Sequence, residues 1–402
     1  MTQIDSRRAG PLQAIVLLLQ CTLGAMGVTI LAPVIPKIIA NYQGVPGVEF
    51  WGPLIVTIPS VCVAVVCPFA GYFADLIGRR NLLIWAIGLY ALIGVAPYFL
   101  NTIPQMIIAR AGLGVVEAIV MTVSTTLIGD YFKGEERDKW LGYQTAVASV
   151  SAVGLIALGG LMGNISWRAP FLVYLSAAPL MLLIILFTWE PRPDELESNV
   201  NAGSWSAFPW SKMLGIYLLT LPASMMFYIV QIQMSTALGE LGINRSSTIG
   251  LLTAGASIGV PVGTLVFQKV SKLSTSRLLL MEFFLIALGF IGMSAANDLN
   301  TFLVFTSINQ IGCGMLLPTM VTWAMRQLSF SMRGRGIGIW ISILSLGTSL
   351  GPAAVTALAI YSDGRVMPAF KYVGFVAIVF AGGALIASLR PRNDQATSSA
   401  LH

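Results

Sequence analysis

Charged residues are scarce in this sequence. Asp, Glu, Lys and Arg make up 10% of its 402 residues, whereas hydrophobic residues make up 56%. Soluble domains carry about 25% charged residues, so this composition indicates an integral membrane protein. The sequence also contains a single histidine, His402, which excludes a catalytic or metal site built on histidines.

Cysteines and catalytic motifs are equally sparse. The four cysteines, Cys21, Cys62, Cys67 and Cys313, lie within apolar stretches and lack the spacing of metal ligands, so we interpret them as small apolar side chains. The sequence contains no phosphate-binding loop, no H-E-x-x-H motif and no pair of intramembrane aspartates. ATP-driven transport and intramembrane proteolysis therefore have no support, and we expect no enzymatic activity, no metal and no cofactor.

Long apolar runs dominate the chain instead. A helix needs about 20 apolar residues to cross a bilayer, and the polar segment 189–210, rich in Pro, Ser and acids, has six such runs on either side. The predicted spans are 12–36, 50–74, 81–100, 103–129, 139–163, 167–188, 211–236, 246–270, 276–296, 300–325, 334–360 and 367–389. We predict an all-α membrane protein with an N-terminal six-helix bundle (1–188), a cytoplasmic linker (189–210) and a C-terminal six-helix bundle (211–402).

Basic residues are unevenly distributed between the predicted loops. If the N-terminus is cytoplasmic, most of the 23 Lys and Arg residues fall on the cytoplasmic side, as the positive-inside rule requires. The net charge of +6 is then explained by helix orientation and by anionic lipid headgroups, not by nucleic acid. We expect both termini to be cytoplasmic.

Two segments indicate an internal repeat. Residues 136–160 and 332–356 align so that Arg137 corresponds to Arg333 and Gly142 to Gly338, each pair opening a helix after a cytoplasmic loop. Duplicated transporters bind substrate between their halves near the middle of the membrane. For these positions alone, coincidence among glycine-rich helices is the alternative.

The loop between the second and third spans carries a specific motif. Residues 71–80, GYFADLIGRR, match G-x-x-x-D-x-x-G-R-[RK] at Gly71, Asp75, Gly78, Arg79 and Arg80. This pattern resembles the signature loop of the major facilitator superfamily, and the resemblance covers nearly the whole chain. It implies two pseudo-symmetric six-helix bundles that transport by alternating access. Gly78 is expected to permit a tight turn.

The same resemblance implies a gating role for the loop charges. In the family, they form a charge relay that latches the two halves when the outside gate is open. Asp75 is expected to face the N-terminal end of the span beginning near Gly334, where a carboxylate complements the helix dipole. Arg79 is expected to pair with Asp130, and Arg137 joins this gating group. Ordinary loop charges that only orient the helices are the alternative.

Further segments are similar to the drug:proton antiporter branch of this superfamily, namely SWRAPF (166–171) and FYIVQIQMSTAL (227–238). That branch carries G-x-x-x-G-P-x-x-G-G in its fifth span. Here the fifth span keeps only Gly159 and Gly160, whereas the eleventh keeps Gly347, Gly351 and Pro352. We assign these residues to close helix packing, and the split motif leaves the direction of transport open.

Two charges lie inside the fourth span, where each costs about 3 kcal/mol or more. Arg110 and Glu117 share a helix face with Gly114 and are separated by about 10 Å along the axis. Arg110 and Gly114 match the family's R-x-x-x-G spacing, which is tied to proton transfer. GVVEA (114–118) is similar to the G-x-G-E-A element of spinster-type lipid transporters, whose glutamate is protonated. We hypothesise that Glu117 binds the coupled proton and Arg110 modulates it; a static buried ion pair is the alternative.

The remaining candidates are a further acid and a set of cavity residues. We predict that Glu282, in the ninth span, snorkels to the cytoplasmic interface. The family cavity is lined by spans one, four, seven and ten. With Gly114, the residues these spans supply here are Gln20, Met26, Met121, Thr122, Met225, Phe227, Tyr228, Gln231, Asn309, Gln310 and Met315. They suit a moderately apolar, adaptable pocket, although ordinary packing is the alternative for any one of them.

Three functions are compatible with these observations. The first is proton-coupled export of hydrophobic or amphipathic small organic compounds from a bacterial cell, across the inner membrane. The second is proton-coupled uptake, or carriage of lipids or organic anions, and the third is a receptor or scaffold that transports nothing. The expected partners are a small-molecule substrate, protons and membrane lipids, and the chain is expected to work as a monomer.

Overall fold

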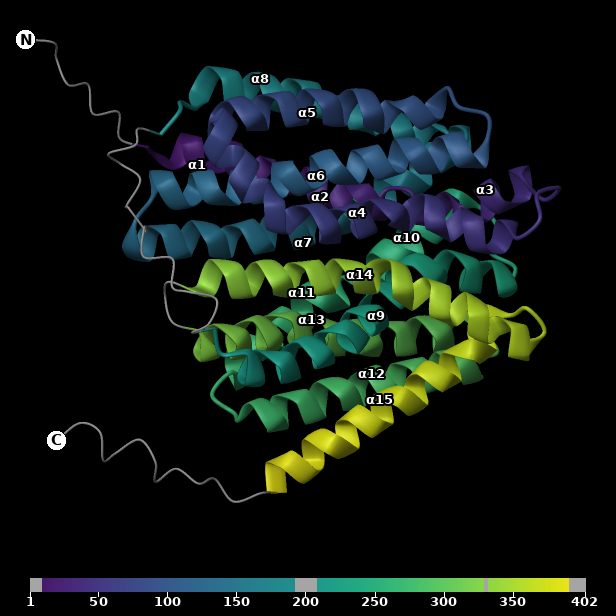
Figure 1. Ribbon diagram of the computed structural model, residues 1–402. Coiled ribbons are helices and arrows are strands. Elements are labelled where there is room, and N and C mark those ends of the chain that lie inside the picture. Colours follow the sequence, from purple (N-terminus) through teal and green to yellow (C-terminus); the bar gives the residue numbers. More distant parts are fainter. Residues whose placement is uncertain (1–8, 192–207, 329–331, 390–402) are drawn as a thin grey trace, which may run out of the picture.

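Long helices cross the molecule from end to end in the computed structural model, which describes residues 9–191, 208–328 and 332–389 (Figure 1). Within these residues, 12 helical segments are long and apolar enough to cross a membrane. The predicted all-α membrane fold with twelve spans is therefore confirmed. Residues 192–207, which make up most of the predicted linker, lie outside the described residues.

The first six spans are built from helices α1 to α8. Their bounds are α1 Pro11–Leu19, α2 Cys21–Thr29, η1 Ala32–Val34 and α3 Ile35–Asn41 for the first span, then α4 Val48–Ile77, α5 Arg79–Val95, α6 Ile103–Tyr131, α7 Gly134–Ile165, and η3 Ala169–Ser176 with α8 Ala177–Phe187. The first span is broken near Pro33 and Pro36, because proline lacks the N–H that continues a helix.

The last six spans are built from helices α9 to α15. Their bounds are α9 Trp210–Glu240, α10 Ser246–Ser257 with α11 Gly259–Val270, α12 Thr275–Ala295, α13 Leu299–Gln327, α14 Arg333–Ala359 and α15 Val366–Leu389. Short 3₁₀ turns, η2 Ala96–Tyr98 and η6 Ile360–Ser362, follow α5 and α14. We call the end of the molecule where α8 ends and α9 begins the linker end.

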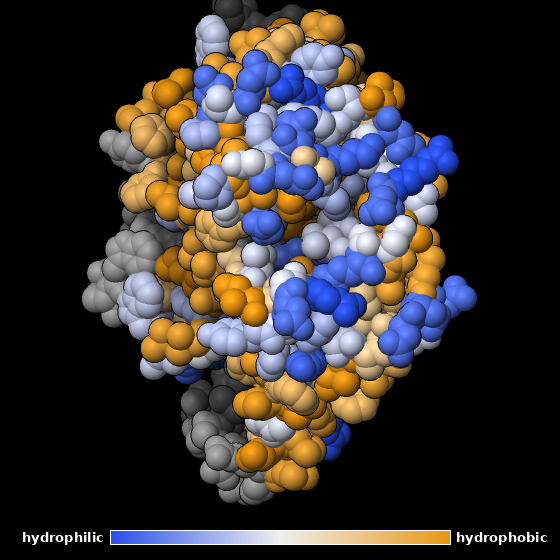
Figure 2. All heavy atoms as spheres, turned by 90° about the vertical axis from the view of Figure 1, so that its right-hand side faces the viewer, coloured by the Kyte–Doolittle hydropathy of each residue, from blue (hydrophilic) through white to orange (hydrophobic). Residues whose placement is uncertain are grey.

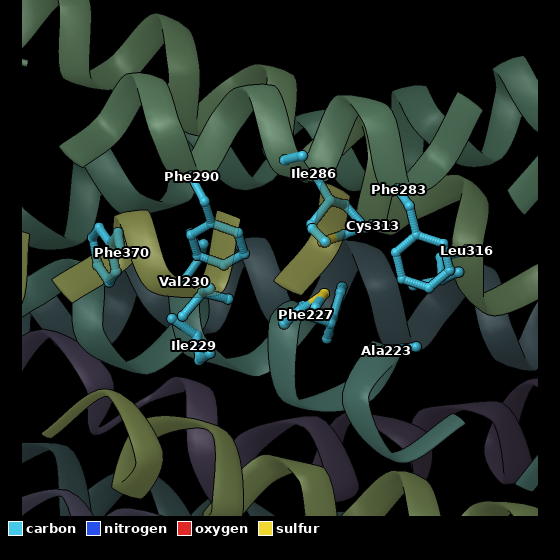
Figure 3. Close-up of a cluster of buried hydrophobic side chains, with 14 of the residues drawn as sticks. Ala223, Phe227, Ile229, Val230, Phe283, Ile286, Phe290, Cys313, Leu316 and Phe370 are labelled. Atoms are coloured by element: carbon cyan, nitrogen blue, oxygen red, sulfur yellow. The ribbon is translucent and has the colours of Figure 1, made fainter. Parts of the chain in front are cut away.

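Each half has its own hydrophobic core. One cluster of buried side chains is drawn almost wholly from α1 to α8, and a second from α9 to α15. In Figure 1 the helices up to α8 lie above those from α9 onward. Figure 3 shows part of the second cluster, in which Phe227 of α9 lies against side chains of α12 and α13. This arrangement agrees with two bundles, although the boundaries at 188 and 211 stay a prediction.

The two halves are joined by α4 against α14 and by α7 against α10. Ser349 of α14 donates a hydrogen bond of 2.8 Å to the backbone carbonyl of Thr57 in α4. The backbone N–H of Ser247 donates to the side-chain oxygen of Asn164, near the end of α7, at 3.1 Å. Both hydrogen bonds lie in the part of the molecule opposite the linker end, so the halves are closed together there.

The end face opposite the linker end is polar. Figure 2 shows hydrophilic residues gathered over the middle of this face and hydrophobic residues along its flanks. Apolar side chains exposed on the flanks suit contact with lipid, and a polar end suits contact with water. The pattern fits a molecule that spans a bilayer along the helix axes of Figure 1.

Glycines bring α7 and α14 unusually close to their neighbours. A Cβ on Gly159 would overlap the backbone carbonyl of Ile30, beside α2, and one on Gly351 would meet the backbone carbonyl of Met225 in α9 at 2.5 Å. The fifth span thus packs on the first, and the eleventh packs on the seventh. A Cβ on Gly347 would likewise overlap Ser224. These close contacts agree with the packing role expected for the split glycine motif.

A substitution at Gly160 tests the contact between the two halves. A Cβ there would meet the carbonyl oxygen of Ser246 at 2.6 Å and Cα of Gly250 at 2.7 Å, both in α10. Overpacking of this kind costs about 1–3 kcal/mol, so we expect Gly160→Ala to lower the melting temperature of the purified protein. Gly154→Ala is the matched control on the same helix, since nothing lies near its Cβ position. Equal melting temperatures for both variants would contradict this packing.

Candidate functional site

Arg110 lies in the middle of α6 and is fully buried. Its guanidinium donates hydrogen bonds to the backbone carbonyls of Ile55 (2.9 Å), Val56 (3.1 Å) and Gly27, and to the hydroxyl of Tyr174 (2.7 Å). These acceptors come from α4, α2 and η3. Arginine is suited to this role because it offers five N–H donors in a fixed fork.

The sequence explains why two of these carbonyls are free to accept. Proline has no N–H, so Pro59 of α4 gives no helical hydrogen bond to the carbonyl of Ile55, four residues earlier. Gly27 lies in the last turn of α2, which ends at Thr29, and the last four carbonyls of a helix lack intrahelical partners. Arg110 therefore satisfies backbone oxygens that would otherwise be unpaired within the membrane.

Glu117 lies two turns further along α6 and is 5% exposed. Its carboxyl group is packed against Gly27, where a Cβ would meet Oε2 at 2.5 Å and Cδ at 3.0 Å. Oε2 is buried with no hydrogen-bond partner among the described residues. Only glycine at position 27 leaves room for this carboxyl group, and the carbonyl of the same residue binds Arg110.

Arg110 and Glu117 do not pair directly. Among the described residues, the structure contains no ion pair between them, because the guanidinium is turned toward backbone carbonyls of other helices. The alternative of a static buried ion pair is therefore wrong for this conformation. Arg110 is permanently charged, so Glu117 is the group of the two that can bind and release a proton.

Two predicted cavity residues of α6 contact α4 instead. A Cβ on Gly114 would overlap the backbone of Pro59, so this glycine serves helix packing. The hydroxyl of Thr122 contacts the sulfur of Cys67 at 3.7 Å. The face of α6 that carries Gly114 is packed on α4, which corrects the expectation that Gly114 lines the cavity. For Thr122, which is partly exposed, that expectation stays a prediction. Met121 is 37% exposed.

The predicted cavity residues of the first span are mostly buried. Met26 is 2% exposed and belongs to the core of the first half. Gln20 is fully buried and donates to the carbonyl of Val16 at 3.0 Å, while its Oε1 has no partner among the described residues. The side chain of Met121 lies beside Gly24, where a Cβ would meet its sulfur at 2.9 Å.

The second half contributes a chain of amides. Gln231 of α9 donates to Gln310 of α13 at 2.8 Å, and Gln310 donates to Asn309 at 3.3 Å. Asn309 donates in turn to the carbonyl of Ile286 in α12 at 3.2 Å. Gln231 keeps 8% exposure, whereas Gln310 and Asn309 are fully buried. The chain ties α9 to the interior of its bundle.

Aromatic and methionine residues of the second half divide between core and interface. Phe227 and Met315 are buried, and Phe227 belongs to the cluster of Figure 3, which places Phe227 in the core of the second half. The assignment of Met315 to the cavity stays a prediction. Tyr228 packs against both hydrophobic clusters, so it lies where the two halves meet. The backbone of Met225 packs on Gly351.

The predicted gating pair forms at the linker end. Arg79, the first residue of α5, makes an ion pair with Asp130 near the end of α6. Gly78, between α4 and α5, has a φ of 93°, which confirms the turn that the motif predicted. Arg137 lies near the start of α7. Gly71 and Asp75 both lie in the last turns of α4, but the side chain of Asp75 is outside what the structure describes, so its contact with α14 stays a prediction.

A further acid at this end was not singled out from the sequence. Glu190, just after α8, accepts the backbone N–H of Arg79 at 2.5 Å and that of Arg80 at 3.0 Å. It thereby caps the N-terminus of α5, where the helix dipole favours a carboxylate. Beside it, Trp189 stacks on Tyr131 with ring centroids 4.8 Å apart. The sequence places Glu190 in a polar linker but gives no sign of which helix it caps.

Glu282 departs from its prediction. It is fully buried in α12 rather than snorkelling to the interface, and its Oε1 lies 2.5 Å from the hydroxyl of Thr319 in α13. The carboxyl group contacts Thr319 of α13, and α15 packs on α12 as well, so the side chain is enclosed within the bundle. Among the described residues, no group of three His, Cys, Asp or Glu side chains is placed to hold a metal ion.

Replacing Arg110 with lysine tests its role in holding the first half together. A lysine ammonium is a point charge that cannot reach four acceptors in three elements, and stranded buried groups are costly. We expect Arg110→Lys to destabilise the protein by about 3 kcal/mol or more, measured by thermal unfolding in detergent. Arg365→Lys, at a side chain 60% exposed, is expected to change stability by about 0.5 kcal/mol at most. Similar effects of the two substitutions would rule out this role.

Comparisons with known proteins agree with this geometry. The class C tetracycline resistance protein of Escherichia coli is 26% identical over 364 residues, covering 86% of this chain and 89% of that protein. The bacillibactin exporter of Bacillus subtilis (strain 168) is 26% identical over 367 residues, covering 83% and 86%.

Among solved structures, the fold resembles a bacterial homolog of the human lysosomal transporter Spinster in an inward-facing, unoccupied conformation. The TM-score is 0.76, with 17% identity, and the match covers 94% of this chain and 98% of the other. The family model for the Major Facilitator Superfamily matches residues 17–236 and 216–400. Because this model accounts for both six-span halves and the gating loop, the chain belongs to the Major Facilitator Superfamily and is a membrane transporter, not an enzyme.

Proposed function

We propose that this transporter exports hydrophobic or amphipathic small organic compounds in exchange for protons, by alternating access. The observation that carries the proposal is the buried Glu117 carboxyl group: within the described part of the chain, its Oε2 has no hydrogen-bond partner and no basic side chain forms an ion pair with it. A carboxylate held this way is unstable in its ionised form, so it favours binding a proton. An acid that gains a proton in one conformation and loses it in another can couple transport to a proton gradient.

The position of Glu117 supports this coupling role. Its carboxyl group touches Gly27, which Arg110 ties to α4 and α6. A change in the charge of Glu117 therefore acts on the last turn of α2, just before the break in the first span. We call this place the joint of the first span. Tyr228 of the second half lies where the two hydrophobic clusters meet, so movement at this joint is transmitted to the interface between the bundles.

The side chains near the interface support an apolar or amphipathic substrate. Met121, Met225 and Tyr228 offer adaptable apolar surface, and Gln231 adds an amide. Such a set suits varied organic compounds better than a sugar, which needs many polar contacts. The names of the relatives, a tetracycline resistance protein and a bacillibactin exporter, support export of such compounds. The proposal places the protein in a bacterial inner membrane with both termini cytoplasmic, working as a monomer.

Proton-coupled uptake, or carriage of a lipid or organic anion, is the second candidate. It is favoured by Glu117 itself and by the GVVEA segment around it, since the drug:proton antiporter pattern has no acid there. The structural similarity to a Spinster homolog concerns the fold alone. The two candidates differ in the direction of the proton gradient that drives accumulation, so one transport experiment separates them.

Glu117→Gln is expected to abolish coupling and keep the protein folded, because glutamine has the same shape and cannot release a proton. The purified protein is reconstituted into liposomes, and uptake of tetracycline or ethidium is measured. Under the exporter proposal, an acidic lumen drives accumulation by the unaltered protein, whereas Glu117→Gln supports only exchange of labelled for unlabelled compound. Glu49→Gln, at an exposed residue of α4, is the matched control and is expected to remain coupled.

The outcomes of this transport experiment distinguish the candidate functions. Accumulation driven by an acidic exterior would favour uptake over export. Gradient-driven accumulation that persists in Glu117→Gln would overturn the role of this residue. Absence of flux for every compound tested, in a folded protein, would favour a protein that transports nothing.

The ion pair at the linker end is expected to affect the rate of transport. Asp130→Asn leaves the Arg79 guanidinium without its carboxylate, and the coupling free energy of the pair, from a double-mutant cycle in thermal unfolding, is expected to be about 1 kcal/mol. If the pair belongs to the gate, Asp130→Asn also lowers the maximal rate of transport with little change in KM. Asp298→Asn, at an exposed helix start on the opposite end, is the control. An unchanged maximal rate in Asp130→Asn would remove the gating role.

A further inference from the structure

A second buried acid lies away from the interface between the bundles. Glu282 of α12 is fully buried, and α12 is packed against α13 and α15 within the second half. Its Oε2 has no hydrogen-bond partner among the described residues. The coupling proposed for Glu117 does not use this group. Because an ionisable side chain inside the membrane is costly, Glu282 needs its own explanation.

The hydrogen bonds of Thr319 bear on the protonation of Glu282. The Thr319 hydroxyl lies 3.0 Å from the carbonyl of Met315 and 2.5 Å from Oε1 of Glu282. A hydroxyl has one proton to donate and can also accept. If it donates to the Met315 carbonyl, which can only accept, then the contact with Glu282 is a hydrogen bond only when the carboxyl group carries the proton. The contact fits a neutral Glu282 that donates to Thr319 as well as a carboxylate that accepts from it, and the charges around Glu282 decide between the two.

The charges around Glu282 agree with a neutral carboxyl group. Among the described residues no cation forms an ion pair with it. On α13 the ionisable side chains are Cys313, buried nearby, and Arg326, two turns beyond Thr319. On α12 itself, Arg277 is exposed.

The other helices of the bundle bring no partner either. The ionisable side chains of α15 are Lys371 and Tyr372, near its opposite end. Phe380 stacks on Phe283 beside Glu282, so Lys371 lies about 14 Å away along the helix axis. The charged residues of α9, Lys212 and Glu240, lie near its two ends. An ionised Glu282 would thus have no counter-ion, and burying it would be costly.

Thr319 also connects the acid to solution. It lines an open crevice near the linker end, together with Thr275 of α12 and Thr322 and Arg326 of α13. Leu278, which also lines the crevice, lies one turn before Glu282 on α12. Thr319, whose hydroxyl contacts the carboxyl group, is therefore one of the residues that line the crevice, which also include the apolar Phe267 and Trp323.

We propose that Glu282 and Thr319 form a second proton-binding site, located inside the C-terminal bundle, that exchanges its proton with solution at the linker end through this crevice. The carboxyl group gives its proton to the Thr319 oxygen while the Thr319 hydroxyl gives its own proton to a water molecule in the crevice. One proton leaves, and Thr319 remains neutral.

This site is separate from the coupling proposed for Glu117. Ionisation of Glu282 places an uncompensated charge between α12 and α13, which weakens the packing of these two helices. The hydrogen bond from Asn309 to Ile286 joins the same two helices. The second half thereby responds to acidity at the linker end, whatever substrate is carried. The site is consequently tested without any transport measurement.

Infrared difference spectroscopy of the purified protein in lipid tests the site directly. The carbonyl stretching band of a protonated carboxylic acid is recorded over a pH series in Glu117→Gln, so that Glu117 does not contribute. We expect a band at neutral pH that is lost in the double variant Glu117→Gln, Glu282→Gln. We also expect Thr319→Val to shift the frequency of this band, because it removes the hydrogen bond, and Thr322→Val to leave the frequency unchanged as the matched control.

The exchange route is tested in the same sample. On transfer to heavy water, the band is expected to shift within the time of buffer exchange, and Thr319→Val is expected to slow this shift. If Glu282→Gln does not fold, the frequency shift caused by Thr319→Val assigns the band instead. The proposal is overturned by the absence of a band dependent on Glu282 or Thr319 at every pH, or by a band that does not exchange in heavy water.

Discussion

The hydrogen bonds of one arginine constrain the rest of this structure. Arg110 is fully buried, yet its guanidinium is satisfied by three carbonyls and one hydroxyl. Two of these carbonyls lack a helical hydrogen bond for local reasons. Gly27 lies in the last turn of α2, and Pro59 has no N–H to donate to the carbonyl of Ile55 in α4. A break in one helix and a proline in another thus create the polar site that an arginine in a third helix fills.

Satisfying Arg110 with neutral oxygens has a consequence for the acid on the same helix. A carboxylate beside the guanidinium would be held ionised and could not exchange a proton readily. Glu117 instead lies against Gly27 with an unpartnered oxygen. The fold thereby places the permanent charge of Arg110, which joins the helices, apart from the carboxyl group that we propose as the proton-binding site. Both share contact with Gly27, so the fixed and variable groups act on the same joint.

The two halves meet through surfaces that glycine makes nearly flat. Gly160 of α7 lies against Gly250 of α10, with hydrogen bonds nearby from Ser247 to Asn164 and, between α14 and α4, from Ser349 to Thr57. At Gly160 and Gly250 the two backbones are in direct contact, because neither residue has a side chain to hold them apart. Such a joint suits a transporter that opens alternately to the two sides of the membrane.

The sequence by itself determined the number of spans, the repeat and the motif loop, because apolar length and glycine or proline positions act locally. It also located Arg110 and Glu117, since charges within a membrane span are rare, and the resemblance of the motif loop to a known family predicted the pair of Arg79 with Asp130. Only the tertiary structure decided what these groups contact. Helix rotation turned Gly114 toward α4, buried Phe227 and enclosed Glu282, because side-chain direction depends on packing between helices distant in sequence.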